Sequence, residues 1–560
     1  MLKYRRWFIW FTVLALVAAV VPFGATALAA PTAQEPPPQP SANVSVFATG
    51  LDNPRGLTFG PDGMLYVAEG GQGGTDSTEG QCDQVVVPVG PYTGSSTGAR
   101  ISKIAADGTR TTVVDNLPSS QTSEALGGEI SGVGAVAFLG DTLYAVLAGA
   151  GCSHGVADVP NALIKANADG TWEIVADLSA YLAANPVARP EEDDFEPDGG
   201  WYSLAADGDN LVAIEPNHGE LDKLTTDGTV SRIVDISASQ GHVVPTALAV
   251  GPDGDFYVGN LDEFPVTHGH SHIYKIAPDG AISVYASGLT AVLGLAFGPQ
   301  GELYALEMSD TATSPDGLPV VPGSGRVVRV MPDGYLEEIA THLMLPTAMT
   351  MGPDGMLYVS NCGFGCPAGA GEIVRIAIPQ RVHGTVGDLS YGVAGMTTMN
   401  SPTEGTSYGF LTGINGMPDD FIFSGSPQGA STAQFTFSTV VTATKSIDMG
   451  DLQIGEFSGT TTVYYNPSGG DLTAPDSFKQ GTPVATFDVW QRIVMDMASG
   501  TMQGVDRNTV TEAQPFQVDG EWYQLVQPGD LFRDSFSGHG DAQNGFVVAG
   551  TGVSLGTMTP

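Results

Sequence analysis

The sequence predicts an all-β protein: a six-bladed β-propeller closed by its N-terminal strand, followed by a C-terminal β-rich domain, either a sandwich or a barrel. Three observations predict this fold. A tight turn between two short apolar runs recurs along the chain, a second short run ending in Asp-Gly follows it, and the repeats stop near residue 380. Repetition of a fixed motif is the signature of a repeat architecture.

The first repeated string is a strand, a tight turn and a second strand. Its clearest form reads Gly-Pro-Asp-Gly followed by an apolar run with an aromatic residue. Pro sets φ for the turn, and Gly accepts the positive φ that follows. Four copies are clear, at residues 60–67, 251–258, 298–305 and 352–359, and two are weaker, at 140–144 and 207–212.

The second repeated string is a short strand that ends in an Asp-Gly turn and leads into another β-rich run. It occurs at residues 103–108, 165–170, 223–228, 275–280 and 329–334, and a sixth copy at 374–377 stops before its turn. Each repeat therefore holds four short antiparallel strands, here named a, b, c and d. Four strands per unit with turns at regular spacing are typical of a propeller blade.

The two ends of the array predict its closure. The sixth unit lacks strand d, and the array begins with an unassigned strand at residues 44–48, which resembles strand d of the fourth unit at 282–289. We expect this N-terminal strand to complete the last blade and leave no open sheet edge. The alternative is an open solenoid, whose terminal repeats would need polar caps that are not evident.

The first residues read as an export signal. Lys3, Arg5 and Arg6 precede an apolar run at residues 7–21, and Ala27-Leu28-Ala29 is a small-residue cleavage site. We therefore expect a signal peptide at residues 1–29, a Pro-rich linker at 30–42 and a secreted, extracellular or cell-envelope protein. The alternative is a retained anchor, because residues 7–30 nearly suffice to span a bilayer; no later stretch is long and apolar enough.

The charge of the chain limits which partners it can bind. The formal net charge is -40, from 61 acidic against 21 basic residues, so binding to a phosphate backbone is excluded. We expect a monomer that binds a small molecule or a protein.

Four cysteines in an exported protein predict two disulfides. Cys362 and Cys366 share a loop, which leaves Cys82 to pair with Cys152 across neighbouring units. Metal binding by these thiols is less favoured, because their spacing fits poorly.

The C-terminal region, residues 381–560, differs from the propeller at 43–380. Residues 439–444, 460–465, 482–489 and 545–553 read as strands divided by turns rich in Ser, Thr, Gly and Asp. Its aromatic and β-branched content argues against a disordered tail. An accessory sandwich or barrel is the expectation.

The repeats also separate two faces of the propeller. All the short Pro-Asp-Gly and Asp-Gly turns are a–b or c–d turns, which share one face. The b–c and d–a connections share the other, and they carry the irregular insertions at residues 70–98, 149–161, 260–271, 308–325 and 361–371. We name this second side the loop face. Binding groups concentrate on loops held by a rigid scaffold, so we expect the site there.

Polar residues recur at one position of the loop face, three residues after the strand-b aromatic. Five of the six units have a carboxylate or amide there: Glu69, Glu215, Asn260, Glu307 and Asn361. Equivalent positions of a closed propeller lie at equal radius, so these oxygens could form a ring that binds Ca²⁺ or Mg²⁺. The alternative is that polar residues are ordinary where a strand ends.

Further candidates come from the same face. Arg55 stands where two other units have Thr, so it could receive a ligand carboxylate or form an ion pair with Glu69 or another acid. We expect Arg55, Glu69 and Asn217 to be ligand-binding residues. His218 and His242 are the candidate bases. His268, His270 and His272 form a compact group that could bind a transition metal or be a solvated loop.

Several segments, taken in order, resemble the ScyD/ScyE family of exported bacterial propellers. They are residues 196–202, 244–254, 257–261 with 264–265, and 357–363. More widely, the repeat is similar to NHL-type blades and to gluconolactonase and streptogramin-lyase propellers. The resemblance covers residues 43–379 and implies the propeller fold. It brings no catalytic residues, and residues 381–560 have no counterpart in that family.

Two functions fit these observations. The first is a secreted scaffold that binds a ligand or partner through its loop face without catalysis. The alternative is a divalent-metal-dependent hydrolase or lyase of the gluconolactonase or streptogramin-lyase kind, in which a divalent cation polarises a carbonyl and a loop His or Glu moves the proton. The sequence leaves open whether the protein is an enzyme, since fold does not determine function.

Overall fold

The computed structural model describes residues 38–126, 128–190, 195–263, 266–310, 320–382, 386–387, 389–401, 403–541 and 544–557. The expected signal peptide and most of the Pro-rich linker lie outside these residues. No helix within the described residues is long and apolar enough to cross a membrane.

Residues 44–376 form six antiparallel sheets, five with four strands and one with five. Sheet 1 contains β2 (Pro54–Phe59), β3 (Leu65–Glu69), β4 (Thr93–Ile104), β5 (Arg110–Gln121) and β6 (Ile130–Ser131). Sheet 2 contains β7 (Val133–Leu139), β8 (Thr142–Leu147), β9 (Ala162–Ala166) and β10 (Trp172–Asp177). Sheet 3 contains β11 (Ser203–Asp207), β12 (Asn210–Glu215), β13 (Glu220–Leu224) and β14 (Val230–Asp235).

The remaining three sheets repeat this pattern. Sheet 4 contains β15 (Pro245–Val250), β16 (Phe256–Asn260), β17 (Ser271–Ile276) and β18 (Ile282–Leu289). Sheet 5 contains β19 (Val292–Phe297), β20 (Leu303–Glu307), β21 (Gly325–Val330) and β22 (Leu336–Leu343). Sheet 6 contains β23 (Ala348–Met351), β24 (Leu357–Asn361), β25 (Gly371–Ile376) and β1 (Val44–Leu51). Short helices in the connections are η1 (Glu124–Leu126), η2 (Cys152–His154), α1 (Leu178–Ala184) and α2 (Ile236–Gln240).

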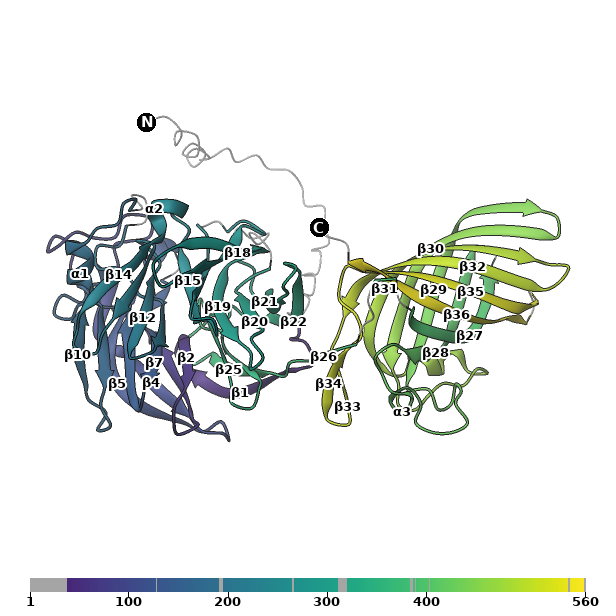
Figure 1. Ribbon diagram of the computed structural model, residues 1–560, viewed down its shortest axis with the longest axis horizontal. Coiled ribbons are helices and arrows are strands. Elements are labelled where there is room, and N and C mark those ends of the chain that lie inside the picture. The colour runs from purple at the N-terminus through teal and green to yellow at the C-terminus, as the bar shows by residue number, and fades with distance from the viewer. Residues whose placement is uncertain are drawn as a thin grey trace, which may run out of the picture. The chain divides into compact units, whose positions relative to one another are not determined.

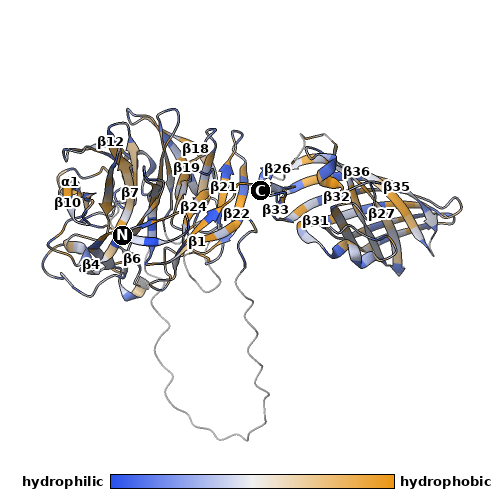
Figure 2. Cartoon of the chain, turned by 90° about the horizontal axis from the view of Figure 1, so that it is seen from below, coloured by the Kyte–Doolittle hydropathy of each residue, from blue (hydrophilic) through white to orange (hydrophobic). Residues whose placement is uncertain are grey.

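The first strands of the sheets form a closed ring. Strand β2 contacts β7, and the contacts continue through β11, β15, β19 and β23 back to β2. The sheets follow one another around this part of the molecule (Figure 1), and hydrophobic stretches run along their strands (Figure 2). Sheets arranged radially around a ring of first strands make a β-propeller.

The N-terminal strand completes the last sheet, as the sequence predicts. Strand β1 pairs antiparallel with β25, with Val44 opposite Ile376 and Leu51 opposite Gly371. The outer strand of sheet 6 therefore comes from the start of the propeller sequence. This pairing joins the two ends of the array and covers the edge of β25.

The repeated turn has a side-chain bond that explains its composition. The Tyr66 hydroxyl on β3 donates to the Asp62 carboxylate at 2.9 Å, and the same bond joins Tyr257 to Asp253 at 3.0 Å. Gly63 has a φ of 75°, a left-handed conformation that favours glycine. The bond also joins Tyr358 to Asp354, so Pro, Asp, Gly and the strand-b Tyr form one structural unit in three of the four clear copies; the fourth has Gln300 in place of Asp.

The C-terminal region folds as a closed barrel of eight strands, which decides between the two predicted alternatives. Its strands, in order, are β27 (Leu389–Ser401), β28 (Glu404–Ile414), β29 (Phe435–Met449), β30 (Leu452–Tyr465), β31 (Thr482–Asp496), β32 (Thr501–Ala513), β35 (Asp530–Asp541) and β36 (Gly545–Thr557). Pairing of β27 with β36 closes the barrel. Beside it, β26 (Gln380–Arg381), β33 (Phe516–Val518) and β34 (Glu521–Gln524) form a small sheet, and α3 (Asp419–Ile422) and η3 (Pro475–Lys479) lie in loops.

Candidate binding site on the loop face

The polar residues at the ends of the strand-b segments hold the d–a connections of their own sheets. Glu69 is fully buried, and its carboxylate accepts a 2.8 Å hydrogen bond from the backbone N–H of Asp52, 17 residues earlier. The same bond, with the same separation, joins Glu307 to Thr290 at 2.5 Å and Asn361 to Met344 at 2.8 Å. The side-chain amide N–H of Asn260 donates a 2.9 Å hydrogen bond to the carbonyl oxygen of Val243. Buried backbone groups need such partners, so this repeated position has a structural role.

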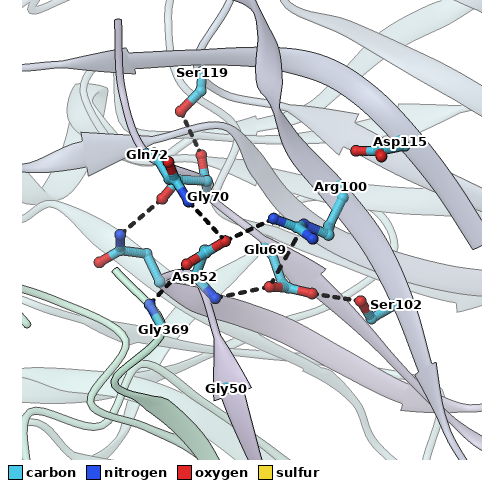
Figure 3. A network of polar contacts seen from close by, with 12 residues as sticks. Gly50, Asp52, Glu69, Gly70, Gln72, Arg100, Ser102, Asp115, Ser119 and Gly369 are labelled. Atoms are coloured by element: carbon cyan, nitrogen blue, oxygen red, sulfur yellow. Dashed lines mark hydrogen bonds and ion pairs between the residues drawn. The ribbon is translucent and has the colours of Figure 1, made fainter. Parts of the chain in front are cut away.

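Arginine side chains form ion pairs with two of these carboxylates. Arg110 lies 2.9 Å from the Glu69 carboxylate, and Arg326 is paired with that of Glu307. Figure 3 shows Glu69 between Asp52, Arg100 and Ser102, with Asp52 also bound by Arg100. Burial still raises the pKa of Glu69 and of Glu307, although the arginines and hydrogen bonds act to lower it.

The oxygens of this donor set are engaged by other groups of the protein. A divalent cation would have to replace the guanidinium beside Glu69 or Glu307, and the amide oxygens of Asn260 and Asn361 already accept from His272 and Met344. Among the residues that the structure describes, no group of three or more His, Cys, Asp or Glu side chains is placed to hold a metal. The proposed metal ring therefore stays a prediction, with no supporting contact between its members.

Arg55 lies at the start of β2 and joins two sheets, sheet 1 and sheet 6. Its guanidinium donates to the carbonyl of Gly363 in the loop after β24 and to that of Ile130 on β6 at 2.7 Å. Burial lowers its pKa, and the neighbouring Tyr202 and Glu129 act in the opposite direction. The alternative ion pair with Glu69 is not formed, because Glu69 pairs with Arg110 and Arg100. The role of Arg55 as a ligand-carboxylate receptor stays a prediction.

Loops from sheets 1, 2 and 3 bring an acid, a histidine and a tyrosine together on the loop face. One oxygen of Glu196 accepts a 2.7 Å hydrogen bond from the Tyr92 hydroxyl, and the other lies 3.6 Å from Nε2 of His154. The rings of Tyr92 and His154 meet edge to face at 4.9 Å. Tyr92 and His154 are buried, whereas the Glu196 side chain is 17% exposed. We name these three residues the Glu196 cluster.

The backbone around the Glu196 cluster is held from several directions. Asp198 accepts hydrogen bonds from both the N–H and the hydroxyl of Ser153, each at 2.7 Å, which holds η2 beside the cluster. The backbone N–H of Glu196 donates to the amide oxygen of Asn217 at 2.9 Å. Asn217, a predicted ligand-binding residue, is therefore placed next to the cluster by its contact with Glu196.

The two predicted bases differ in their surroundings. His218 is buried: its backbone N–H donates to Glu215 at 2.5 Å, its Nδ1 lies 3.2 Å from the same oxygen, and its ring packs edge to face on Phe195. Although burial acts in the opposite direction, Glu215 raises the pKa of His218, and the His218 contacts lower the pKa of Glu215. His242 lies half-buried between α2 and β15, and no role follows from its position.

The three histidines of the fourth b–c loop do not converge on one point. Nδ1 of His268 lies 2.7 Å from the carbonyl oxygen of Asp310, and His270 is largely exposed beside Asp262. The ring of His272 stacks on Tyr274. A shared metal site has no support in this geometry.

Both predicted disulfides are confirmed. Cys82 pairs with Cys152, the first residue of η2, and Cys362 pairs with Cys366 in the loop after β24. The first disulfide joins the loops of sheets 1 and 2, immediately beside Ser153 and His154. It therefore supports the segment that carries one member of the Glu196 cluster.

Sequence reasoning missed Tyr92, Glu196, Asp198 and Tyr202. Glu196 ends an acidic run that reads as a solvated loop, and its partners lie 104 and 42 residues away in the sequence. No fixed spacing signals such contacts, because they depend on how neighbouring loops meet. The signal that could have found Glu196, Asp198 and Tyr202 is the resemblance of residues 196–202 to exported propellers.

No family model matches the chain, and no curated protein matches it. Among solved structures, it is similar to a gluconolactonase from Xanthomonas campestris, with 14% identity over 60% of this chain and 89% of that chain and a TM-score of 0.38. It is also similar to a glucose dehydrogenase, with 15% identity over 60% and 99% and a TM-score of 0.37. The aldose sugar dehydrogenase of Escherichia coli gives 15% identity over 60% and 99% and a TM-score of 0.35. These similarities make no statement about the activity of this chain.

Proposed function

We propose that this chain is an exported, monomeric binding protein whose six sheets are the six blades of one ScyD/ScyE-like propeller, and whose loop face binds a small hydroxyl-rich ligand at the Glu196 cluster. The geometry of one side chain supports this proposal most. Glu196 is held by groups from two other loops, and 17% of its side chain is still exposed.

The chemistry of the cluster favours hydroxyl groups over charged ones. A carboxylate accepts hydrogen bonds strongly, and a hydroxyl group is a donor that it can accept from. The net charge of -40 disfavours anionic ligands and nucleic acid. Aromatic rings beside a few polar groups are typical of small-molecule sites. A neutral polyol or sugar satisfies these conditions.

The alternative is a hydrolase or lyase acting on such a compound. The observation in its favour is the buried Glu215–His218 pair, close to the Glu196 cluster through Phe195. A histidine held by a carboxylate can move a proton. As predicted from the sequence, this alternative depends on a divalent cation, and His218 and Glu196 are the groups of this chain that would move the proton.

The test uses the mature protein and a set of neutral sugars, sugar lactones and sugar acids as probes. Its thermal midpoint is measured with each probe for the native protein and for the variants Glu196→Gln and Glu173→Gln. Glu173 is an exposed acid on β10 and provides the matched control. We expect a neutral probe to raise the midpoint in the native protein and in Glu173→Gln, and to have no effect on Glu196→Gln.

Two outcomes would count against the proposal. If no neutral probe raises the midpoint, or if Glu196→Gln responds as the native protein does, the Glu196 cluster is not the binding site. Following the same probes by NMR distinguishes binding from turnover. Consumption of a lactone that is lost in His218→Gln would favour the enzyme, and unchanged probes would favour the scaffold.

A further inference from the structure

A cavity of about 660 Å³ is lined mainly by residues of the C-terminal barrel. Its walls are largely apolar and include Phe437, Val463, Phe487, Leu525 and Phe532. Pockets that bind small molecules are commonly about 300–1,000 Å³ and combine apolar walls with a few polar groups. The barrel cavity has both the size and the apolar walls of such a pocket.

A group of polar side chains lines one part of this cavity. The Tyr391 hydroxyl on β27 donates to Asp534 on β35 at 2.8 Å, and the Asn508 amide on β32 donates to the other oxygen of Asp534 at 2.8 Å. Asp506 also lies on β32 and stands directly opposite Asp534 in the strand pairing. All four residues line the cavity. Like charges directly opposite each other destabilise a sheet, so this pair has a cost in the folded state.

Two acceptors of this group have no partner. Asn508 is only 5% exposed, and its side-chain oxygen accepts no hydrogen bond; one carboxylate oxygen of Asp506 is also buried and unpartnered. Buried acceptors are nearly always satisfied in native proteins, and an unsatisfied one calls for an explanation. Both oxygens belong to residues that line the cavity, which is where a ligand would supply the missing donors.

The electrostatics of the group favour a positive charge in the cavity. Burial, and then the neighbouring Asp534, raises the pKa of Asp506 to about 8, and burial raises the pKa of Asp534 to about 7. Apart from the action of Asp534 on Asp506, the side chains that act on them are Tyr391, Gln491 and Asn508, which are all neutral. Arg507 and Arg533 on the same strands are exposed, and Arg381, which also lines the cavity, pairs with Asp530 at 3.3 Å.

We propose that the barrel cavity binds an apolar compound carrying a protonated amine, whose N–H groups donate to Asp506, Asp534 and the free oxygen of Asn508. The apolar part of the compound packs against the phenylalanines of the wall. An ammonium group offers up to three donors and a positive charge, which are the two things that this group of acceptors lacks. The site is independent of the function proposed for the propeller.

The experiment compares three probes of the same length by titration calorimetry on the full mature chain near neutral pH. We expect octylamine to bind at least about tenfold more tightly than 1-octanol, a difference of about 1.4 kcal/mol, and octanoate to bind most weakly. Equal binding of octylamine and 1-octanol would show an apolar cavity without amine recognition and would overturn the proposal, as would preferential binding of octanoate.

Substitutions of the two aspartates test whether octylamine binds beside them. Asp506→Asn and Asp534→Asn should each weaken octylamine binding by about tenfold or more and leave 1-octanol unchanged. The control is Asp488→Asn, an acid on β31 whose side chain is exposed outside the barrel. Should one variant fail to fold, the other still decides the question, and unchanged octylamine affinity in a folded variant would overturn the proposal.

The pH dependence provides a second measurement on the native chain. Octylamine keeps its proton below about pH 10, as a lysine amine does. Its affinity should therefore rise between pH 6 and pH 8 as Asp534 and Asp506 ionise, with protons released on binding. A flat profile would contradict ion pairing with these carboxylates.

Discussion

The Tyr202 hydroxyl donates a 2.7 Å hydrogen bond to the carbonyl oxygen of Thr347 and so joins sheet 3 to sheet 6. These two sheets stand opposite each other in the ring of first strands, because two sheets separate them in either direction. Arg55 lies beside this bond and contacts sheets 6 and 1. A hydrogen bond on the loop face thus links two opposite sheets.

Tyr202→Phe should lower the free energy of unfolding by about 1–2 kcal/mol, because the largely buried carbonyl of Thr347 would lose its donor while the ring is retained. The measurement is urea unfolding monitored by fluorescence. Tyr285→Phe is the control, since Tyr285 is among the exposed side chains and should give a change near zero. Equal effects of the two substitutions would contradict a cross-ring role for Tyr202.

The Glu69–Arg110 pair should behave as a buried structural ion pair. Removing one partner leaves the other charge unpaired, so Glu69→Gln and Arg110→Met should each cost about 3 kcal/mol. The double variant should cost clearly less than the sum, because neither unpaired charge then remains. The exposed pair Lys165–Glu173 serves as the control and should show a coupling below about 1 kcal/mol. Additive effects at Glu69 and Arg110 would argue against the pair.

The Glu215–His218 pair should make stability depend on pH. The pKa of His218 is raised in the folded state, so its contribution is complete below the ordinary histidine pKa of about 6.5 and is lost as the pH rises through the folded value. The pKa of Glu215 is lowered, so its contribution is present above about pH 4.3 and is lost on further acidification.

His218→Gln should therefore destabilise the protein more near pH 6 than near pH 9, where the native histidine has lost its charge. Urea unfolding at the two pH values measures the difference. His270→Gln is the matched control, because the His270 side chain is 67% exposed and its loss should have a small effect at both pH values. A larger effect of His218→Gln at high pH would show that Glu215 does not hold a charged imidazole.

The acidic pair of the barrel should act in the opposite direction to Glu215. The pKa values of Asp506 and Asp534 are raised to about 8 and about 7, so the folded state holds protons that the unfolded state has released. Stability should fall as the pH rises from about 4 through these values. Asp506→Asn should therefore stabilise the protein above pH 8 by about 1–3 kcal/mol and have little effect near pH 4.

Thermal or urea unfolding of the protein at both pH values, followed by a signal from the barrel, measures this change in stability. Asp488→Asn, on the outer surface of β31, provides the comparison and should change stability little at either pH. Destabilisation by Asp506→Asn at high pH would mean that Asp506 is ionised and paired in the native protein.

Local chemistry made a large part of the fold predictable. A turn that needs Pro, Asp and Gly around a strand-b Tyr leaves a sequence signature wherever it occurs, as the Tyr66–Asp62 bond shows. The missing strand of the last unit and the extra strand at Val44–Leu51 predicted the closing pair, and cysteine positions predicted both disulfides. These features depend on neighbours in the chain or on simple pairing rules.

The sequence by itself thus determined the repeating sheets, the pairing of their ends and the side of the propeller that carries the irregular loops. Only the tertiary structure decided what the polar residues do. Glu69 and its equivalents turned inward to satisfy backbone groups, whereas Glu196 met Tyr92 and His154 from loops far away in the sequence. The opposition of Asp506 and Asp534 inside a closed barrel likewise follows from strand register. Such contacts depend on how separate segments meet in space, and no local pattern records that.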